Sequence, residues 1–263
     1  MSNKKQCWPL SQISTLHYIK LVFRSALFLV ATVAYIVNRR NATGGMFGGA
    51  ENRPAILMVL WLIFAVEMIL RFFPSKLESM GCEKQFLRNF SPAICSGAQT
   101  DEKHKHAKST LSVAAVWIFL NAAIGALYLT KHIDQGILLL ISLAFSVCDM
   151  VCILFFCPFQ TWIMKNKCCG SCRIYNWDYA MMLTPLIFLK SIYTWSLLAL
   201  SFGLLVKWEI TYCRHPERFS ETINDSLSCS NCQEKLCRHK KSLQRFLKQQ
   251  RILLITEKDK RNK

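Results

Sequence analysis

The sequence predicts an all-α fold: a polytopic membrane helix bundle of about five transmembrane helices, with a cysteine-rich loop and a basic, cysteine-rich C-terminal tail. Two observations predict the bundle. Hydrophobic residues make up 52% of the 263 positions and the mean hydropathy is +0.22, which is unusual for a soluble domain. The apolar residues also gather in blocks of membrane length, which favours transmembrane helices over one large soluble core.

Each block is long enough to cross a bilayer, because roughly 20 helical residues at about 1.5 Å each span about 30 Å of hydrocarbon. The predicted spans are residues 17–37, 55–73, 111–130, 136–156 and 180–206. The first is followed by Arg39 and Arg40 without a small-residue cleavage pattern, so we expect a retained anchor and not a signal peptide. Pro185 is expected to kink the last span near its start.

Two regions follow from these spans. Residues 1–206 form the five-span transmembrane domain, including the cysteine-rich loop 157–179, and residues 207–263 form the tail. An odd number of crossings places the tail on the face opposite the N-terminus. We expect an integral, multi-pass protein with the lipid bilayer as its first partner, in the cell or inner membrane if the source is bacterial.

The net charge of +17 comes largely from the flanks of the spans and from the tail. Basic segments beside a membrane span are typical of attraction to anionic lipid, at about 1 kcal/mol for each charge near the surface. No basic region carries the interleaved aromatic residues of a single-strand binder, so no nucleic-acid partner is expected.

Eight of the thirteen cysteines form two compact sets on either side of the last span. The first set is Cys157, Cys168, Cys169 and Cys172, and the second is Cys213, Cys229, Cys232 and Cys237. Each set contains a Cys-x-x-Cys pair, and four thiolates close a tetrahedral zinc site or hold an iron–sulfur cluster. The sequence therefore predicts a metal site in each set, with iron–sulfur or zinc as the cofactor.

Three interpretations of these thiols stay open, namely bound metal, disulfides and unliganded thiols. Disulfides persist outside the cytoplasm, whereas metal thiolates suit a reducing interior, so the two faces favour different chemistry. Cys148 and Cys152 lie four residues apart on one face of the fourth span, where they either fill helix contacts or extend the sulfur-rich surface from Cys157.

Charged residues inside the spans predict a polar intramembrane pocket, because burying such a residue unpaired costs about 3 kcal/mol or more. These residues are Arg24, Glu67, Arg71, Asp149 and Lys190. The expected depths of Arg24, Glu67, Asp149 and Lys190 fall in one half of the bilayer, beneath the first cysteine set. Arg71 lies four residues after Glu67, a spacing at which the two can neutralise one another. A structural ion-pair network and a pocket for protons, a quinone-like headgroup or a small anion are the two interpretations.

The aromatic residues of the cysteine loop are interpreted as an interfacial belt: Trp162, Tyr175, Trp177 and Tyr179. No b-type haem is expected, since no histidine lies deep in a span. Neither a nucleophile elbow nor a paired-histidine zinc motif is present, so if the protein is an enzyme we expect a redox subunit and not a hydrolase.

The functional hypothesis is a cysteine-ligated metal site that takes part in membrane-associated electron transfer with a membrane or soluble redox partner. In this hypothesis both cysteine sets are ligands, and Glu67, Asp149 and Lys190 line the polar pocket. The alternative is a non-redox membrane scaffold or transporter-like subunit, whose cysteines hold structural zinc or disulfides.

Overall fold

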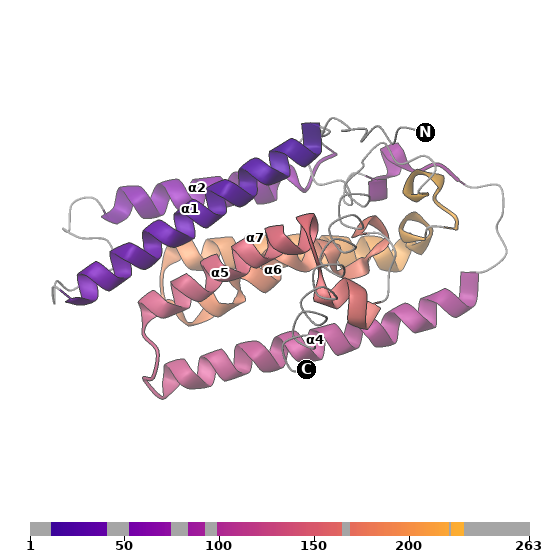
Figure 1. Ribbon diagram of the computed structural model, residues 1–263. Helices are drawn as coiled ribbons and strands as arrows, with labels where there is room; N and C mark the ends of the chain where they lie inside the picture. Colours follow the sequence, from indigo (N-terminus) through magenta and orange to yellow (C-terminus); the bar gives the residue numbers. More distant parts are fainter. Residues whose placement is uncertain are drawn as a thin grey trace, which may run out of the picture.

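The computed structural model describes residues 12–40, 53–74, 84–92, 99–164, 169–220 and 222–228. Within these ranges the chain is helical, with one isolated bridge between Pro92 and Asn224 and no strand, as the all-α prediction requires. The α-helices are α1 (Gln12–Arg40), α2 (Arg53–Leu70), α4 (Gln99–Leu129), α5 (Gln135–Leu154), α6 (Asp178–Leu183) and α7 (Ile192–Arg214) (Figure 1).

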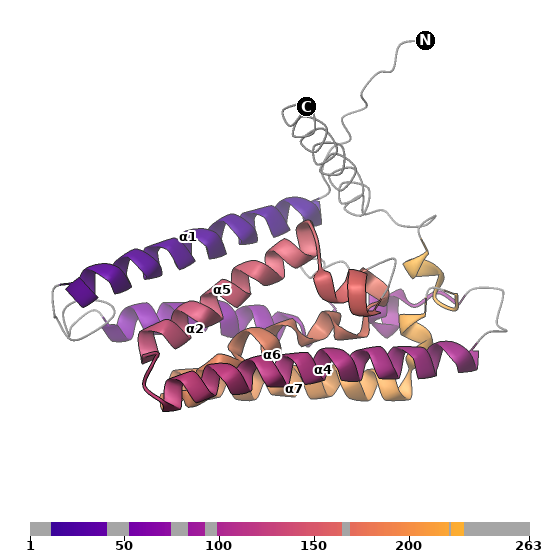
Figure 2. The same ribbon diagram turned by 60° about the horizontal axis from the view of Figure 1, so that its bottom comes forward.

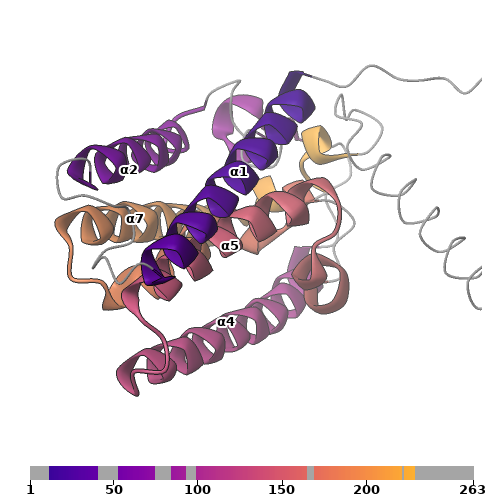
Figure 3. The same ribbon diagram turned by 60° about the vertical axis from the view of Figure 1, so that its left-hand side comes forward.

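Four helices of the described chain contain a segment long and apolar enough to cross a membrane, which indicates a membrane protein. The segments are Thr15–Val37, Lys108–Leu129, Gln135–Leu154 and Ile192–Arg214, and Trp61–Leu70 of α2 is a shorter apolar stretch. Helix α1 and helix α4 lie on opposite sides of the bundle with α5 between them (Figure 2). Figure 3 shows α1 crossing over α5, the helix on which it packs most extensively.

The turn between α4 and α5 has a local explanation. Lys131 adopts a positive φ of 60°, which closes the turn tightly. Asp134 then caps α5, because its carboxylate accepts a hydrogen bond from the Ile137 backbone N–H at 2.9 Å. Helix α5 ends just before the Cys157-Pro158 pair, where proline restricts the preceding residue and cannot continue the backbone ladder.

The predicted span 180–206 is not one continuous helix. Helix α6 passes at Thr184 into the 3₁₀ helix η5 (Thr184–Phe188), the chain turns at residues 189–191, and α7 begins at Ile192. Pro185 lacks the N–H that an α-helix needs there, so the tighter 3₁₀ geometry follows. Thr194 Oγ1 and Trp195 Nε1 both donate to the Leu189 carbonyl at 3.0 Å and stabilise the turn.

Because of this turn, α7 runs back beside η5 and α6 and brings the start of the tail to the end of the bundle that holds the cysteine loop. There the Asp225 N–H donates to the Ser91 carbonyl at 2.8 Å, and Ser226 Oγ donates to the Asn89 carbonyl at 2.9 Å. The sequence-based prediction of five crossings placed the tail at the end opposite the cysteine loop. It treated residues 180–206 as one helix, and the turn at residues 189–191 accounts for the difference.

Close packing of α4 on η5 depends on Gly125. A Cβ atom at this position would lie 2.4 Å from Cζ of Phe188, so the ring occupies the space of the missing side chain. We expect Gly125→Val to lower the free energy of unfolding by about 1–3 kcal/mol through overpacking. Thermal unfolding of the purified protein in detergent would measure this, with exposed Ala126→Val on the same helix as the control. Equal melting temperatures for the two variants would contradict the prediction.

Candidate functional site

A buried arginine joins three helices, α1, α2 and α5. Arg24 of α1 is only 3% exposed and donates to the Glu67 carboxylate of α2 at 2.8 Å. It also donates to the Asp149 carboxylate of α5 at 3.3 Å and to the Ser146 carbonyl at 3.3 Å. The structure thus brings together three of the five charged residues that the sequence singles out, as one ion-pair network.

Glu67 has two further partners. Lys20 Nζ lies 3.4 Å from one carboxylate oxygen, and the Tyr179 hydroxyl donates to the other at 3.0 Å. Burial, and then the negative charge of Glu67, raise the pKa of Tyr179 well above its ordinary value. The hydroxyl therefore keeps its proton and remains a donor to the carboxylate.

Arg71, the residue after the end of α2, belongs to a second pair, with Asp178. Its Nη1 lies 2.5 Å from the Asp178 carboxylate, and its guanidinium stacks over the Tyr179 ring at 4.8 Å. Lys190 lies outside both pairs, because the chain is turning there and its side chain is exposed at the opposite end of the bundle. The depth predicted for Lys190 assumed one continuous helix through residues 180–206, and the structure has a turn there.

The loop before α6 is a buried polar clamp formed by the 3₁₀ helix η4 (Arg173–Trp177). Arg173 Nε donates to the Glu209 carboxylate of α7 at 3.1 Å, and Trp177 Nε1 donates to the same carboxylate at 2.7 Å. Burial lowers the pKa of Arg173, but hydrogen bonds to Glu209 and its charge raise that pKa by more, so the guanidinium stays charged.

A second set of contacts ties η4 to the segment after α2. Asn176 Nδ2 donates to Gln85 Oε1 at 2.7 Å, and Gln85 Nε2 donates to the Gly170 carbonyl at 2.7 Å. Trp177 is buried in the clamp and Tyr179 is buried against Glu67 and Arg71, whereas Trp162 is 69% exposed. Of the predicted interfacial belt, Trp162 has the exposure that such a role requires, while Trp177 and Tyr179 donate to the buried carboxylates of Glu209 and Glu67.

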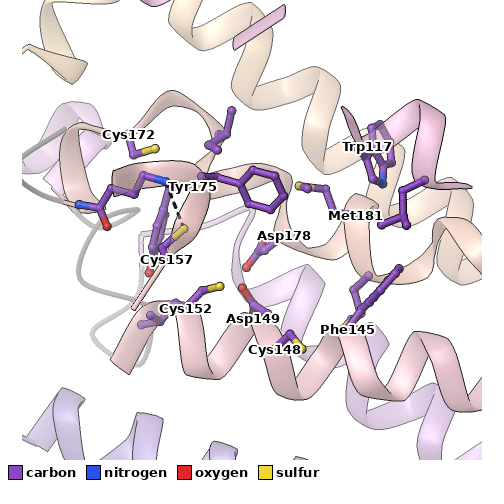
Figure 4. Close-up of a pocket in the computed structure, with 16 residues that line it drawn as sticks. Trp117, Phe145, Cys148, Asp149, Cys152, Cys157, Cys172, Tyr175, Asp178 and Met181 are labelled. Atoms are coloured by element: carbon purple, nitrogen blue, oxygen red, sulfur yellow. Dashed lines mark hydrogen bonds between the residues drawn. The ribbon is translucent and has the colours of Figure 1, made fainter. Parts of the chain in front are cut away.

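A cavity of about 180 Å³ lies between α4, α5, η4, α6 and the π-helical turn η2 (Phe159–Met164). Four cysteines line it: Cys148, Cys152, Cys157 and Cys172 (Figure 4). Cys157 and Cys172 come from the predicted first ligand set, and Cys148 and Cys152 extend the sulfur surface along α5. The carboxylates of Asp149 and Asp178 also line the cavity and point toward one another in Figure 4.

Two of these thiols are direct neighbours. The side chains of Cys152 and Cys157 lie next to each other on the cavity wall (Figure 4), and the Gln160 backbone N–H donates to Cys157 Sγ at 3.4 Å. Cys152 is in the last turn of α5 and Cys157 follows the helix end, so the irregular backbone at Phe155–Cys157 brings the two side chains together.

The remaining predicted ligands do not add to this group in the part of the chain that the structure describes. Cys169 begins the 3₁₀ helix η3 (Cys169–Ser171) and is described by its backbone alone, and Cys213 is exposed on α7. Cys168, Cys229, Cys232 and Cys237 lie outside the described residues. Among described side chains, no group of three or more His, Cys, Asp or Glu residues could hold a metal ion.

The rest of the cavity wall is apolar and aromatic, with one notable donor. The indole nitrogen of Trp117 on α4 is buried and has no hydrogen-bond partner among the described residues. A buried N–H of this kind costs free energy unless a partner is supplied, and a bound molecule can supply it. The arrangement can therefore accept an apolar ligand that carries an oxygen acceptor, next to a pair of redox-capable thiols.

No family model, curated protein or solved structure matches this chain.

Proposed function

We propose that this membrane protein takes part in electron transfer through a thiol pair, Cys152 and Cys157, at the cysteine-lined cavity. The observation that carries the proposal is that the two thiols are neighbours on the wall of one largely apolar cavity within a membrane protein. A dithiol at this position can lose two electrons and two protons as one S–S bond forms, and the reverse reaction restores it.

The surroundings of Cys157 support its role as the attacking sulfur. The thiolate is the reactive form, and a hydrogen bond to sulfur favours the thiolate over the thiol. The Gln160 N–H supplies such a bond at 3.4 Å. Because Cys157 lies beyond the end of α5, a movement of its backbone toward Cys152 leaves the hydrogen-bond ladder of α5 intact, although its carbonyl accepts from the Thr161 N–H at 3.0 Å.

A cysteine-bound metal, iron–sulfur or zinc, is the second candidate. The observation in its favour is that Cys157 and Cys172, fifteen residues apart and both in the first predicted set, line one cavity. Among the described side chains no group of three or more His, Cys, Asp or Glu residues could hold a metal ion, so the thiol pair is the better supported centre. If the protein forms neither the Cys152–Cys157 disulfide nor a cysteine-bound metal site, the non-redox scaffold or transporter-like role is the remaining candidate.

The test is a redox titration of the purified full chain in detergent, prepared without oxygen. After equilibration at a series of potentials, thiols are alkylated and the peptides are mapped by mass spectrometry. We expect a Cys152–Cys157 disulfide that appears and disappears reversibly, and that Cys157→Ser removes. Cys213→Ser, an exposed thiol outside the cavity, is the matched control and should leave the titration unchanged.

Two results would overturn the thiol-pair proposal. One is full alkylation of both Cys152 and Cys157 at every potential. The other is stoichiometric iron or zinc whose loss follows substitution of Cys157 or Cys172, since metal-bound thiolates would then be the centre.

A further inference from the structure

The cavity reaches the side of the bundle between α4 and α5. Its wall there is formed by Trp117 and Leu120 of α4 and by Phe145 and Cys148 of α5. Leu120 is 44% exposed and Cys148 is also exposed, so the cavity continues to the protein surface at these residues. Helix α4 packs mainly on η2 and η5, and α5 packs mainly on α1, α6 and η5, whereas α4 and α5 have few direct contacts with each other.

This mouth lies at membrane depth. Trp117 and Leu120 fall within the candidate span Lys108–Leu129, and Phe145 and Cys148 fall within Gln135–Leu154. Large apolar side chains are exposed on α4 beside the mouth, including Val116 and Phe119. A molecule that enters here comes from the hydrocarbon, and must therefore be soluble in lipid.

The interior sets the size and polarity of such a molecule. A cavity of about 150 Å³ holds one benzene ring, so the cavity of about 180 Å³ has room for a single six-membered ring with small substituents. Asp149 and Asp178 are each paired with an arginine, Arg24 and Arg71, so no unneutralised charge opposes an uncharged ring. Trp117 lines the cavity, and its buried indole N–H has no hydrogen-bond partner among the described residues.

We propose that the cavity binds the ring of a quinone-class lipid carrier, which enters from the bilayer between α4 and α5 and accepts a hydrogen bond from Trp117. An apolar tail on the ring would leave through the mouth beside Leu120 and Cys148. The redox part of this inference rests on the proposed thiol pair, whereas the binding does not.

The electrons and protons that the thiol pair releases equal those that the quinone accepts. In the dithiol-to-disulfide direction the two S–H bonds of Cys152 and Cys157 break and one S–S bond forms. The two electrons reduce the quinone, and the two protons end on its two ring oxygens, so that a hydroquinone leaves toward the membrane. Among carriers that are soluble in lipid, a quinone accepts the same number of electrons and protons as the dithiol releases.

Binding can be tested without the redox step. The full chain carrying Cys152→Ser and Cys157→Ser is placed in lipid nanodiscs and labelled with a decyl-tailed azido-benzoquinone under light. Non-azido decyl-benzoquinone competes, and decane serves as the competitor without a ring. We expect saturable labelling that the quinone displaces and decane does not, on peptides that contain Trp117–Leu120 or Phe145–Ile153.

Variants of the mouth give the matched comparison. Cys148→Phe should lower the apparent affinity at least about tenfold, because the ring fills the entrance. Val151→Phe, at a lipid-exposed position of α5 that does not line the cavity, should leave it within about twofold. Trp117→Phe should weaken binding by about two- to tenfold through loss of one hydrogen bond.

Each outcome bears on the proposal. Equal labelling of Cys148→Phe and Val151→Phe, or displacement by decane as effective as by the quinone, overturns the quinone site. Saturable binding in a protein whose thiols never form the disulfide leaves this inference standing and removes the proposed function. Reversible disulfide formation without saturable labelling overturns this inference and leaves the proposed function standing.

Discussion

Arg24→Met is expected to cause the largest loss of stability of any single substitution in the described chain. The guanidinium is buried and is the cation that Glu67 and Asp149 share, at 2.8 and 3.3 Å. Its removal leaves two carboxylates inside the bundle without that partner, and breaking a buried ion pair in this way costs about 3–5 kcal/mol. Since proteins are stable by only about 5–15 kcal/mol, the variant should lose most of its folded population on mild heating.

Thermal unfolding in detergent, followed by size-exclusion chromatography of the heated samples, would measure the effect. Lys20→Met is the matched control, because Lys20 contacts the same Glu67 carboxylate at 3.4 Å but is 26% exposed. We expect it to cost no more than about 1 kcal/mol. Similar melting temperatures for the two variants would show that Arg24 does not hold the three helices together.

Gln85→Leu is expected to have the next largest effect, and to act locally on the cysteine loop. Gln85 is fully buried and connects the Asn176 amide with the Gly170 carbonyl through two bonds of 2.7 Å. Leucine has a similar volume but can make neither bond. The Asn176 amide and the Gly170 carbonyl each lose a buried hydrogen-bond partner, and each loss lowers the free energy of unfolding by about 1–3 kcal/mol.

Alkylation of Cys172 reports on this local change, since the thiol is buried next to the clamp in the wild type. We expect Gln85→Leu to speed its alkylation well before global unfolding, because the loop opens as a unit. Arg88→Ala, an exposed position in the same segment, should leave the rate unchanged. A rate in Gln85→Leu equal to that in Arg88→Ala would contradict the prediction.

The membrane bundle could be predicted from the sequence because hydrophobic length is a local property of the chain. The meeting of Arg24, Glu67 and Asp149 could be anticipated in the same way, since their positions along separate helices give them similar depths. Likewise, the placement of Cys157 directly after the end of α5 brought it near Cys152.

The clamp and the turn could not be predicted in this way. Gln85 meets Asn176 across 91 residues, and Arg71 meets Asp178 across 107, and no periodicity of a single sequence encodes such pairs. Polar residues between aromatic ones in Arg173–Trp177 fit a solvated interface as well as a buried clamp. Pro185 signalled a kink, but the reversal at residues 189–191 also depends on the hydrogen bonds that Thr194 and Trp195 donate to Leu189.

That reversal also bears on which side of the membrane the thiols face. Because α7 returns, the start of the tail lies at the end of the bundle that holds the cysteine loop, and the lysines and arginines near the spans at that end include Lys84, Arg88, Lys103, Lys105, Lys108, Arg173, Arg214 and Arg218. The opposite end holds five, namely Arg39, Arg40, Arg53, Lys131 and Lys190. Under the positive-inside rule we expect the cysteine end to face the cytoplasm, where glutathione-level reductants would return a Cys152–Cys157 disulfide to the dithiol.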